Sequence, residues 1–132
     1  MDQTSIWLHN FNVDRTLHRL ATYVQPSTAA ALLKFLVEEE NRLGTGPEEV
    51  QNSTRRVREG RERIAKISNV IDGMVEHGLM DQEQLSRALS VVTNMREAQR
   101  LVEQCHEARS IPQSLSKENI GYDTKPSDQE IA

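Results

Sequence analysis

The chain is poor in the residues that define several large protein classes. Its 132 residues include one cysteine, four prolines and six glycines, and aromatic residues make up 4%. A single cysteine excludes an internal disulfide and a cysteine-based zinc site. Glycine and proline are too scarce for an all-β chain with many tight turns.

Long apolar runs are also missing. No segment reaches the roughly 18 consecutive apolar residues of a membrane-spanning helix. The first residues carry an acid at Asp2 and no basic cluster, so no secretory signal is expected. These features predict a cytoplasmic protein without a membrane partner.

The composition suits one small domain. Apolar residues make up 36% of the chain, enough for a thin core, and most domains have about 100–200 residues. The net charge is −4, which argues against general binding to nucleic acids.

Apolar residues recur at helical spacing through most of the chain, which predicts an all-α fold. Breaks fall at Pro26, Gly44 and Gly78, residue types that end helices. The helical domain is expected to span residues 1–109 and a flexible tail residues 110–132, where no apolar period survives. The expected helices cover residues 10–24, 27–43, 47–77 and 81–109, after a lead-in over residues 1–9.

The third and fourth expected helices carry apolar residues in heptads, the pattern of a coiled coil. A short turn between them predicts an antiparallel hairpin in which Gly60 faces Gln99. A hairpin buries one stripe per helix, so the first two helices or a second copy must cover the rest. The seam residues are Val50, Val57, Ile64, Ile67, Ile71, Met74, Leu85, Val92, Met95 and Val102.

A basic stretch lies on the third expected helix. Two acids, Glu59 and Glu62, interleave with the bases at the spacing of helical ion pairs, which favours a solvated flank of the coiled coil. The alternative is a patch that contacts nucleic-acid phosphates, although stacking aromatics are lacking nearby. The bases are Arg55, Arg56, Arg58, Arg61, Arg63 and Lys66.

The acidic triplet and a Glu-x-x-His pair are both interpreted as structural features. Glu38, Glu39 and Glu40 are expected on a solvated helical face, or opposite the basic stretch, because three consecutive side chains do not converge on an ion. Glu103 and His106 match the Glu-x-x-His spacing of di-iron bundles, but the sequence holds no second such pair. We therefore predict no metal site, and His106 is expected to pack or to pair with a neighbouring helix.

Two histidines are candidates for phosphotransfer, because phosphotransfer domains are helical bundles of this size. His18 lies near Arg15 and Arg19, and His106 also has an arginine nearby. Neither histidine has the His-x-x-Lys-Gly pattern of those domains.

Two further features are expected to be structural. Cys105 and His106 are neighbours on a helix and diverge, so they do not form a nucleophile–base pair. Cys105 is interpreted as half-buried and inert. Trp7 and Phe11 are expected to fasten the first helix to the bundle, whereas exposure of Trp7 would indicate a docking point.

Two segments carry recurring motifs: LLKFLVEEENRL over residues 32–43 has the pattern LLxxLxEEE, and RRVREGRERIA over residues 55–65 has the pattern REGxxRIA. In this order the two motifs resemble elements of short α-proteobacterial helical proteins of unknown function. Residues 93–99 stand in the place of a later Thr-x-x-x-x-x-Gln stretch, although the turn lacks the group's Asp-Gly-His cluster and the tail is longer. The resemblance covers residues 28–107 and implies a bacterial source and a helical hairpin, with no functional residues.

The sequence thus predicts a non-enzymatic protein. It contains no glycine-rich phosphate loop, nucleophile elbow or metal-ligand set, whereas sustained heptads need a partner surface. We expect an interaction, regulatory or scaffold protein that forms a homodimer or binds another protein helix-in-groove, without cofactor. Histidine phosphotransfer and nucleic-acid binding through residues 55–66 are the alternatives.

Overall fold

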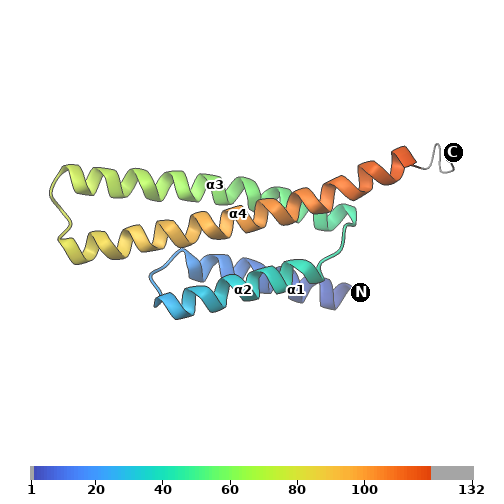
Figure 1. The fold of residues 1–132 in the computed structure, drawn as a ribbon, viewed down its shortest axis with the longest axis horizontal. Coiled ribbons are helices and arrows are strands. Elements are labelled where there is room, and N and C mark those ends of the chain that lie inside the picture. The colour runs from blue at the N-terminus through green and yellow to red at the C-terminus, as the bar shows by residue number, and fades with distance from the viewer. Residues whose placement is uncertain (1, 120–132) are drawn as a thin grey trace.

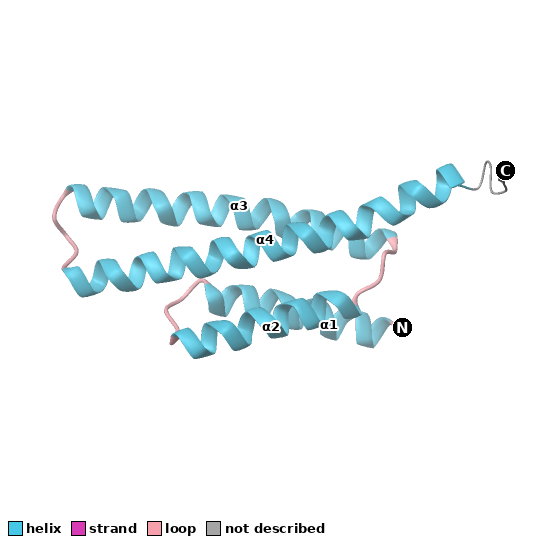
Figure 2. Ribbon diagram, in the orientation of Figure 1, coloured by secondary structure: helices cyan, strands magenta, loops and turns pink. Residues whose placement is uncertain are grey.

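A computed structural model describes the backbone of residues 2–119 and the side chains of residues 2–110, and this part of the chain forms four helices. No strand occurs within that backbone range, so the predicted all-α class is confirmed (Figure 2). The helices are α1 (Gln3–Leu20), α2 (Pro26–Arg42), α3 (Pro47–Glu76) and α4 (Gln82–Asn119).

Helix α1 is displaced toward the N-terminus from its predicted position. It begins at Gln3 instead of residue 10, because the Asp2 carboxylate accepts a hydrogen bond of 2.8 Å from the backbone N–H of Ser5. A side-chain cap of this kind satisfies one of the free N–H groups of the first turn. The predicted lead-in over residues 1–9 is therefore wrong, and α1 ends at Leu20 before reaching Val24.

The other boundaries follow the predicted breaks, with one exception at the end of α4. Helix α2 begins at Pro26, one residue before its predicted start at residue 27, and α3 begins at Pro47 as expected. The backbone of α4 continues to Asn119, whereas the sequence predicted an end near residue 109. Loss of the apolar period marks where packing ends, and a helix can continue beyond it. The rest of the predicted tail, residues 120–132, lies outside the described residues.

The turn between α3 and α4 follows from three residues. Gly78 has a φ of +67°, a left-handed conformation that glycine adopts without strain. Asp81 and Gln84 form a reciprocal capping box, with bonds of 2.8 Å and 3.0 Å between each side chain and the other residue's N–H. The turn reverses the chain and starts α4 within a few residues.

Helices α3 and α4 lie side by side as a long hairpin, and the α1–α2 pair packs along part of it (Figure 1). The α1–α2 pair covers the hairpin near its open end, while the α3–α4 turn extends beyond the α1–α2 loop. The main core lies at this junction, where Val13 and Leu20 of α1 and Leu36 of α2 meet Val57 and Val102 of the hairpin.

The register of the hairpin agrees with the heptads. A Cβ atom on Gly60 would lie 1.9 Å from Oε1 of Gln99, so the glutamine side chain fills the space beside the glycine. The Gln99 amide donates a 3.0 Å hydrogen bond to the Val57 carbonyl. One heptad further on, Ser53 and His106 are joined at 2.8 Å. The predicted pairing of Gly60 with Gln99 is thereby confirmed.

The seam residues differ in burial along the hairpin. Those that are buried are Val57, Ile71, Val92, Met95 and Val102. Those that are half-buried are Val50, Ile64, Ile67, Met74 and Leu85.

Candidate functional site

The basic stretch does not form a single surface stripe. Arg56 is only 2% exposed, and its Nε donates to Asp14 of α1 at 2.9 Å while its Nη2 donates to Asn10. Arg55 bonds to Asp14 at 3.2 Å and to Glu59 at 3.0 Å. Two of the six bases therefore hold α1 against α3, and the expectation of a solvated flank is wrong for Arg56.

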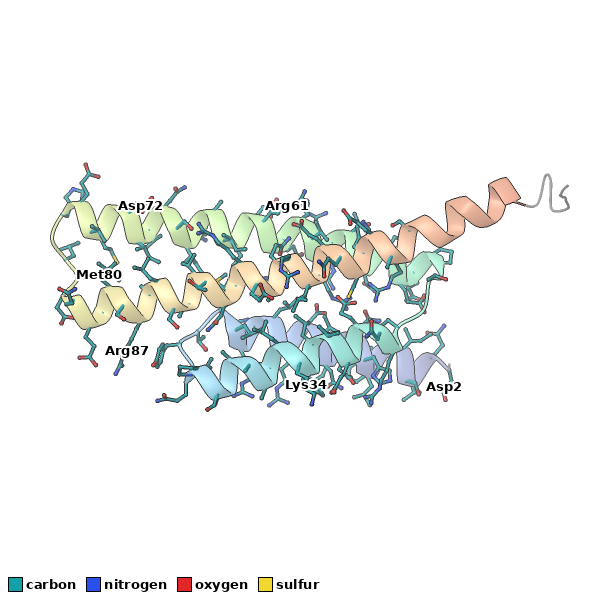
Figure 3. All side chains as sticks on the ribbon, in the orientation of Figure 1. Asp2, Lys34, Arg61, Asp72, Met80 and Arg87 are labelled. Carbon is teal, nitrogen blue, oxygen red and sulfur yellow. The ribbon has the colours of Figure 1, made fainter. Side chains whose placement is uncertain are left out.

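The other bases of the stretch are more exposed. Arg61 donates a 3.0 Å hydrogen bond to Glu103 of α4. Figure 3 shows Arg61 on α3. Arg58 and Lys66 are exposed, and Arg63 is half-buried. Among the described side chains Arg63 has no carboxylate within ion-pair distance.

A polar cleft of about 270 Å³ lies between α1 and α3, next to the buried Arg56. Asp14 and Glu59 neutralise two of its three arginines, so the lining keeps an excess of positive charge. Its polar lining residues are Asp14, His18, Arg55, Arg56, Glu59 and Arg63.

The acidic triplet is split between the surface and the interior. Glu38 is exposed, but Glu39 and Glu40 are 1% and 2% exposed, so the predicted solvated face is wrong for these two residues. Neither of them meets the basic stretch. Their partners lie on α1, on α2 itself and on α4 at the open end of the hairpin.

Glu39 joins α2 to α1. Its carboxylate contacts His9 Nδ1 at 2.8 Å and accepts hydrogen bonds from Asn12 at 2.7 Å and Arg42 at 2.6 Å. Burial alone would raise the pKa of Glu39, but the hydrogen bonds from His9, Asn12 and Arg42 hold it below its ordinary value. Glu39 is therefore an ionised group within the α1–α2 contact.

Glu40 joins α2 to α4 through Arg109, whose side chain is 4% exposed. Nη2 of Arg109 donates to the Glu40 carboxylate at 2.6 Å and to its backbone carbonyl at 2.8 Å. The two residues also line a groove of about 340 Å³ between α2 and α4, together with the half-buried Cys105. Burial, followed by the nearby Glu40 carboxylate, raises the pKa of the Cys105 thiol. The thiol is therefore a weak nucleophile at neutral pH. This agrees with the prediction that Cys105 is inert.

The Glu-x-x-His pair is used for packing between helices. Glu103 accepts hydrogen bonds from Arg61 and Gln99, and these bonds lower its pKa. His106 bonds to Ser53 of α3. The prediction that His106 pairs with a neighbouring helix is therefore confirmed. Within the described part of the chain, no three His, Cys, Asp or Glu side chains form a group that would hold a metal ion.

The aromatic residues of α1 do not fasten the helix to the bundle. Trp7 is 64% exposed and Phe11 45% exposed, and their rings stack on each other at 5.4 Å between centroids. The bonds of His9 and Asn12 to Glu39, and not the aromatic residues, hold this end of α1 against α2. Trp7 is exposed, and the docking point expected for an exposed Trp7 stays a prediction.

Tyr23 in the α1–α2 loop contacts the hairpin through a cation. The Arg87 guanidinium lies 5.1 Å from the Tyr23 ring centroid. Figure 3 shows Arg87 on the side of α4 nearest this loop. The contact marks how far the α1–α2 pair reaches along α4.

Sequence reasoning missed Asn10, Asp14 and Arg109 as partners of buried charges. Arg109 and Glu40 are 69 positions apart, and Arg56 and Asp14 are 42 positions apart. No spacing rule connects such positions. A weak signal was the charge at Arg109, which occupies a seam position of the heptad.

Comparison of the chain with protein-family models, curated proteins and solved structures gave no match. Among helices of the described residues, none combines the length and apolar character needed to cross a membrane.

Proposed function

We propose that this protein is a non-enzymatic interaction module that self-associates through the end of its hairpin. The hairpin tip, defined as residues 64–92, extends beyond the α1–α2 pair, which reaches the border of the tip where Tyr23 meets Arg87 (Figure 1). The observation that carries the proposal is the exposure of large apolar side chains there: Val70 53%, Val75 48%, Leu79 64% and Leu89 51%.

The positions of these side chains favour a helical partner. Val70 and Val75 flank the α3 seam on opposite sides, and Leu89 flanks the α4 seam. A seam with apolar flanks is wider than a two-stranded coiled coil needs and matches the apolar face of a four-helix bundle. Two hairpin tips packed together provide four helices.

The test is absolute mass by light scattering over a dilution series. We expect a dimer that dissociates on dilution, and we expect Leu89→Glu to shift the protein to monomer. Phe35→Glu is the matched control, because Phe35 is a 38% exposed apolar side chain on α2, outside the tip. A wild-type monomer at every concentration, or equal effects of the two variants, would contradict self-association through the tip.

Nucleic-acid binding is the weaker alternative, because Arg55, Arg56 and Arg61 already have carboxylate partners. It predicts binding whose affinity falls steeply as salt increases. Binding that is absent or insensitive to salt contradicts it.

Phosphotransfer is favoured at His18 over His106. His18 is exposed at the cleft, whereas His106 is half-buried against Ser53. Acetyl phosphate would transfer its phosphoryl group to a ring nitrogen of His18, releasing acetate, and the label should disappear in His18→Gln. Absence of label on the wild-type protein contradicts this alternative.

A further inference from the structure

The cleft between α1 and α3 is lined by more hydrogen-bond donors on its arginines than its two carboxylates accept from. Asp14 accepts from both Arg55 and Arg56, and Glu59 accepts from Arg55. Arg63 lines the same cleft without a carboxylate partner among the described side chains.

Arg56 adds a second, independent observation. Its Nε and Nη2 atoms are held by Asp14 and Asn10, which fixes the guanidinium in place. Its Nη1 is buried and has no hydrogen-bond partner among the described residues. A buried N–H group without an acceptor is unfavourable, so this atom favours an added acceptor.

We infer that this cleft binds a phosphate group, either free or as a phosphomonoester. A tetrahedral phosphate has enough oxygens to accept from Arg63 and His18 and, once the side chains that cover it shift, also from the buried Nη1 of Arg56, whereas a carboxylate has only two. Guanidinium groups bind phosphate oxygens through charge-assisted hydrogen bonds. The cleft volume of about 270 Å³ suits a small ligand.

The site is also built before the ligand arrives. Asp14 and Asn10 hold Arg56, and Asp14 with Glu59 holds Arg55, so two guanidinium groups are already oriented. Binding therefore requires ordering of Arg63 and a shift of the side chains that cover Arg56 Nη1, but no reorientation of the two held guanidinium groups. This inference does not depend on self-association, because the cleft lies on α1 and α3 outside the hairpin tip.

The experiment is calorimetric titration of the full chain with inorganic phosphate and with glycerol 1-phosphate at low ionic strength, with glycerol as the neutral control. Backbone amide NMR spectra recorded along the titration locate the site. We expect saturable binding that shifts signals of α1 and α3 around the cleft. Tighter binding of glycerol 1-phosphate identifies a phosphomonoester as the ligand, and tighter binding of inorganic phosphate identifies free phosphate.

The decisive variant is Arg63→Gln, with Arg58→Gln as its control. Both remove one positive charge from α3, but Arg58 is 61% exposed in its side chain and does not line the cleft. Arg63→Gln should weaken phosphate binding about tenfold or more, and Arg58→Gln less than about twofold, because a direct charged hydrogen bond exceeds a screened charge effect.

Three results would overturn the inference. They are no saturable binding to the wild-type protein, equal weakening by the two variants, and acetate binding as tight as that of phosphate. Circular dichroism of Arg63→Gln should match that of the wild type, since this side chain has no ion-pair partner among residues 2–110.

Discussion

Arg109 reaches across the bundle to a carboxylate 69 positions earlier in the chain. Both side chains are almost fully buried, and Glu40 Oε2 and Arg109 Nη1 keep no partner among the described residues. Taking two charges out of water is costly, so such a pair stabilises the fold less than its short distance suggests. Removing one partner is strongly destabilising, because it leaves an uncompensated charge buried in the protein.

We therefore expect Arg109→Met to lower the free energy of unfolding by about 3–5 kcal/mol. The double variant Glu40→Leu, Arg109→Met should recover most of this loss, since no buried charge remains. Urea denaturation measures both. Arg100→Met is the control, because Arg100 pairs with Glu97 on the exposed face of α4. A double variant as unstable as the single one would contradict the explanation.

Glu39 makes the α1–α2 contact sensitive to acid. Its pKa is lower in the folded protein than its ordinary value of 4.5, so the unfolded chain binds the proton more readily. The stabilising contribution is complete above that value and is lost as the pH falls below it. The cause is loss of the hydrogen bonds that His9, Asn12 and Arg42 make to the carboxylate.

This gives a prediction for Glu39→Gln. At neutral pH the variant should be less stable by about 1–3 kcal/mol, because charged hydrogen bonds become neutral or are lost. The difference from the wild type should shrink as the pH decreases below 4.5. Urea denaturation across the acidic range measures it, and a difference that is constant with pH would contradict the assigned role.

At the scale of the helix, Gly60 and Gln99 act as a coupled pair. Alanine in place of glycine favours a helix interior by about 0.5–1 kcal/mol. Here its Cβ would lie 1.9 Å from Gln99 Oε1, so the glutamine would have to leave its bond to the Val57 carbonyl.

We expect Gly60→Ala to be destabilising by about 1 kcal/mol in the wild type and stabilising in a Gln99→Ala background. A thermodynamic cycle of the four proteins, measured by urea denaturation, gives the coupling. Gly73→Ala is the control, because a methyl group at that position would meet no neighbouring side chain within 4 Å. Additive effects at positions 60 and 99 would show that the two residues do not interact.

The sequence was sufficient for the hairpin and insufficient for the docking of the other two helices. Heptads repeat locally, so they fix which face of α3 meets α4, and Gly60 opposite Gln99 follows. Docking of α1–α2 depends on Arg56 with Asp14 and on Arg109 with Glu40, contacts that no local period encodes. The start of α1 was also missed, because it depends on one capping carboxylate, Asp2, and not on a repeating apolar pattern.

At the scale of the whole molecule, stability should be uneven along the hairpin. The α1–α2 pair covers the open half, where Val57, Ala98 and Val102 belong to the main core, and leaves the hairpin tip with one buried stripe. Segments with few buried contacts open more often than the core.

Amide hydrogen exchange should therefore be faster in residues 64–92 than in residues 95–106 when the protein is dilute. Raising the protein concentration should slow exchange selectively in the tip, because self-association would cover it. Mass spectrometry of peptides from the two segments measures the difference. Equal protection along α3 and α4 in dilute protein would contradict this division.

The side-chain hydrogen bonds that join α3 and α4 to other helices lie in the open half of the hairpin, among the described residues. They involve positions 53–61 of α3 and 99–109 of α4. Two of them, Arg56 with Asp14 and Arg109 with Glu40, fix where α1–α2 docks on an otherwise repetitive apolar seam. Beyond these positions, deleting or inserting one heptad in each arm would change the reach of the hairpin by about 10 Å and leave these bonds intact. The length of the hairpin can therefore change in steps of one heptad without a change in the contacts that dock α1–α2.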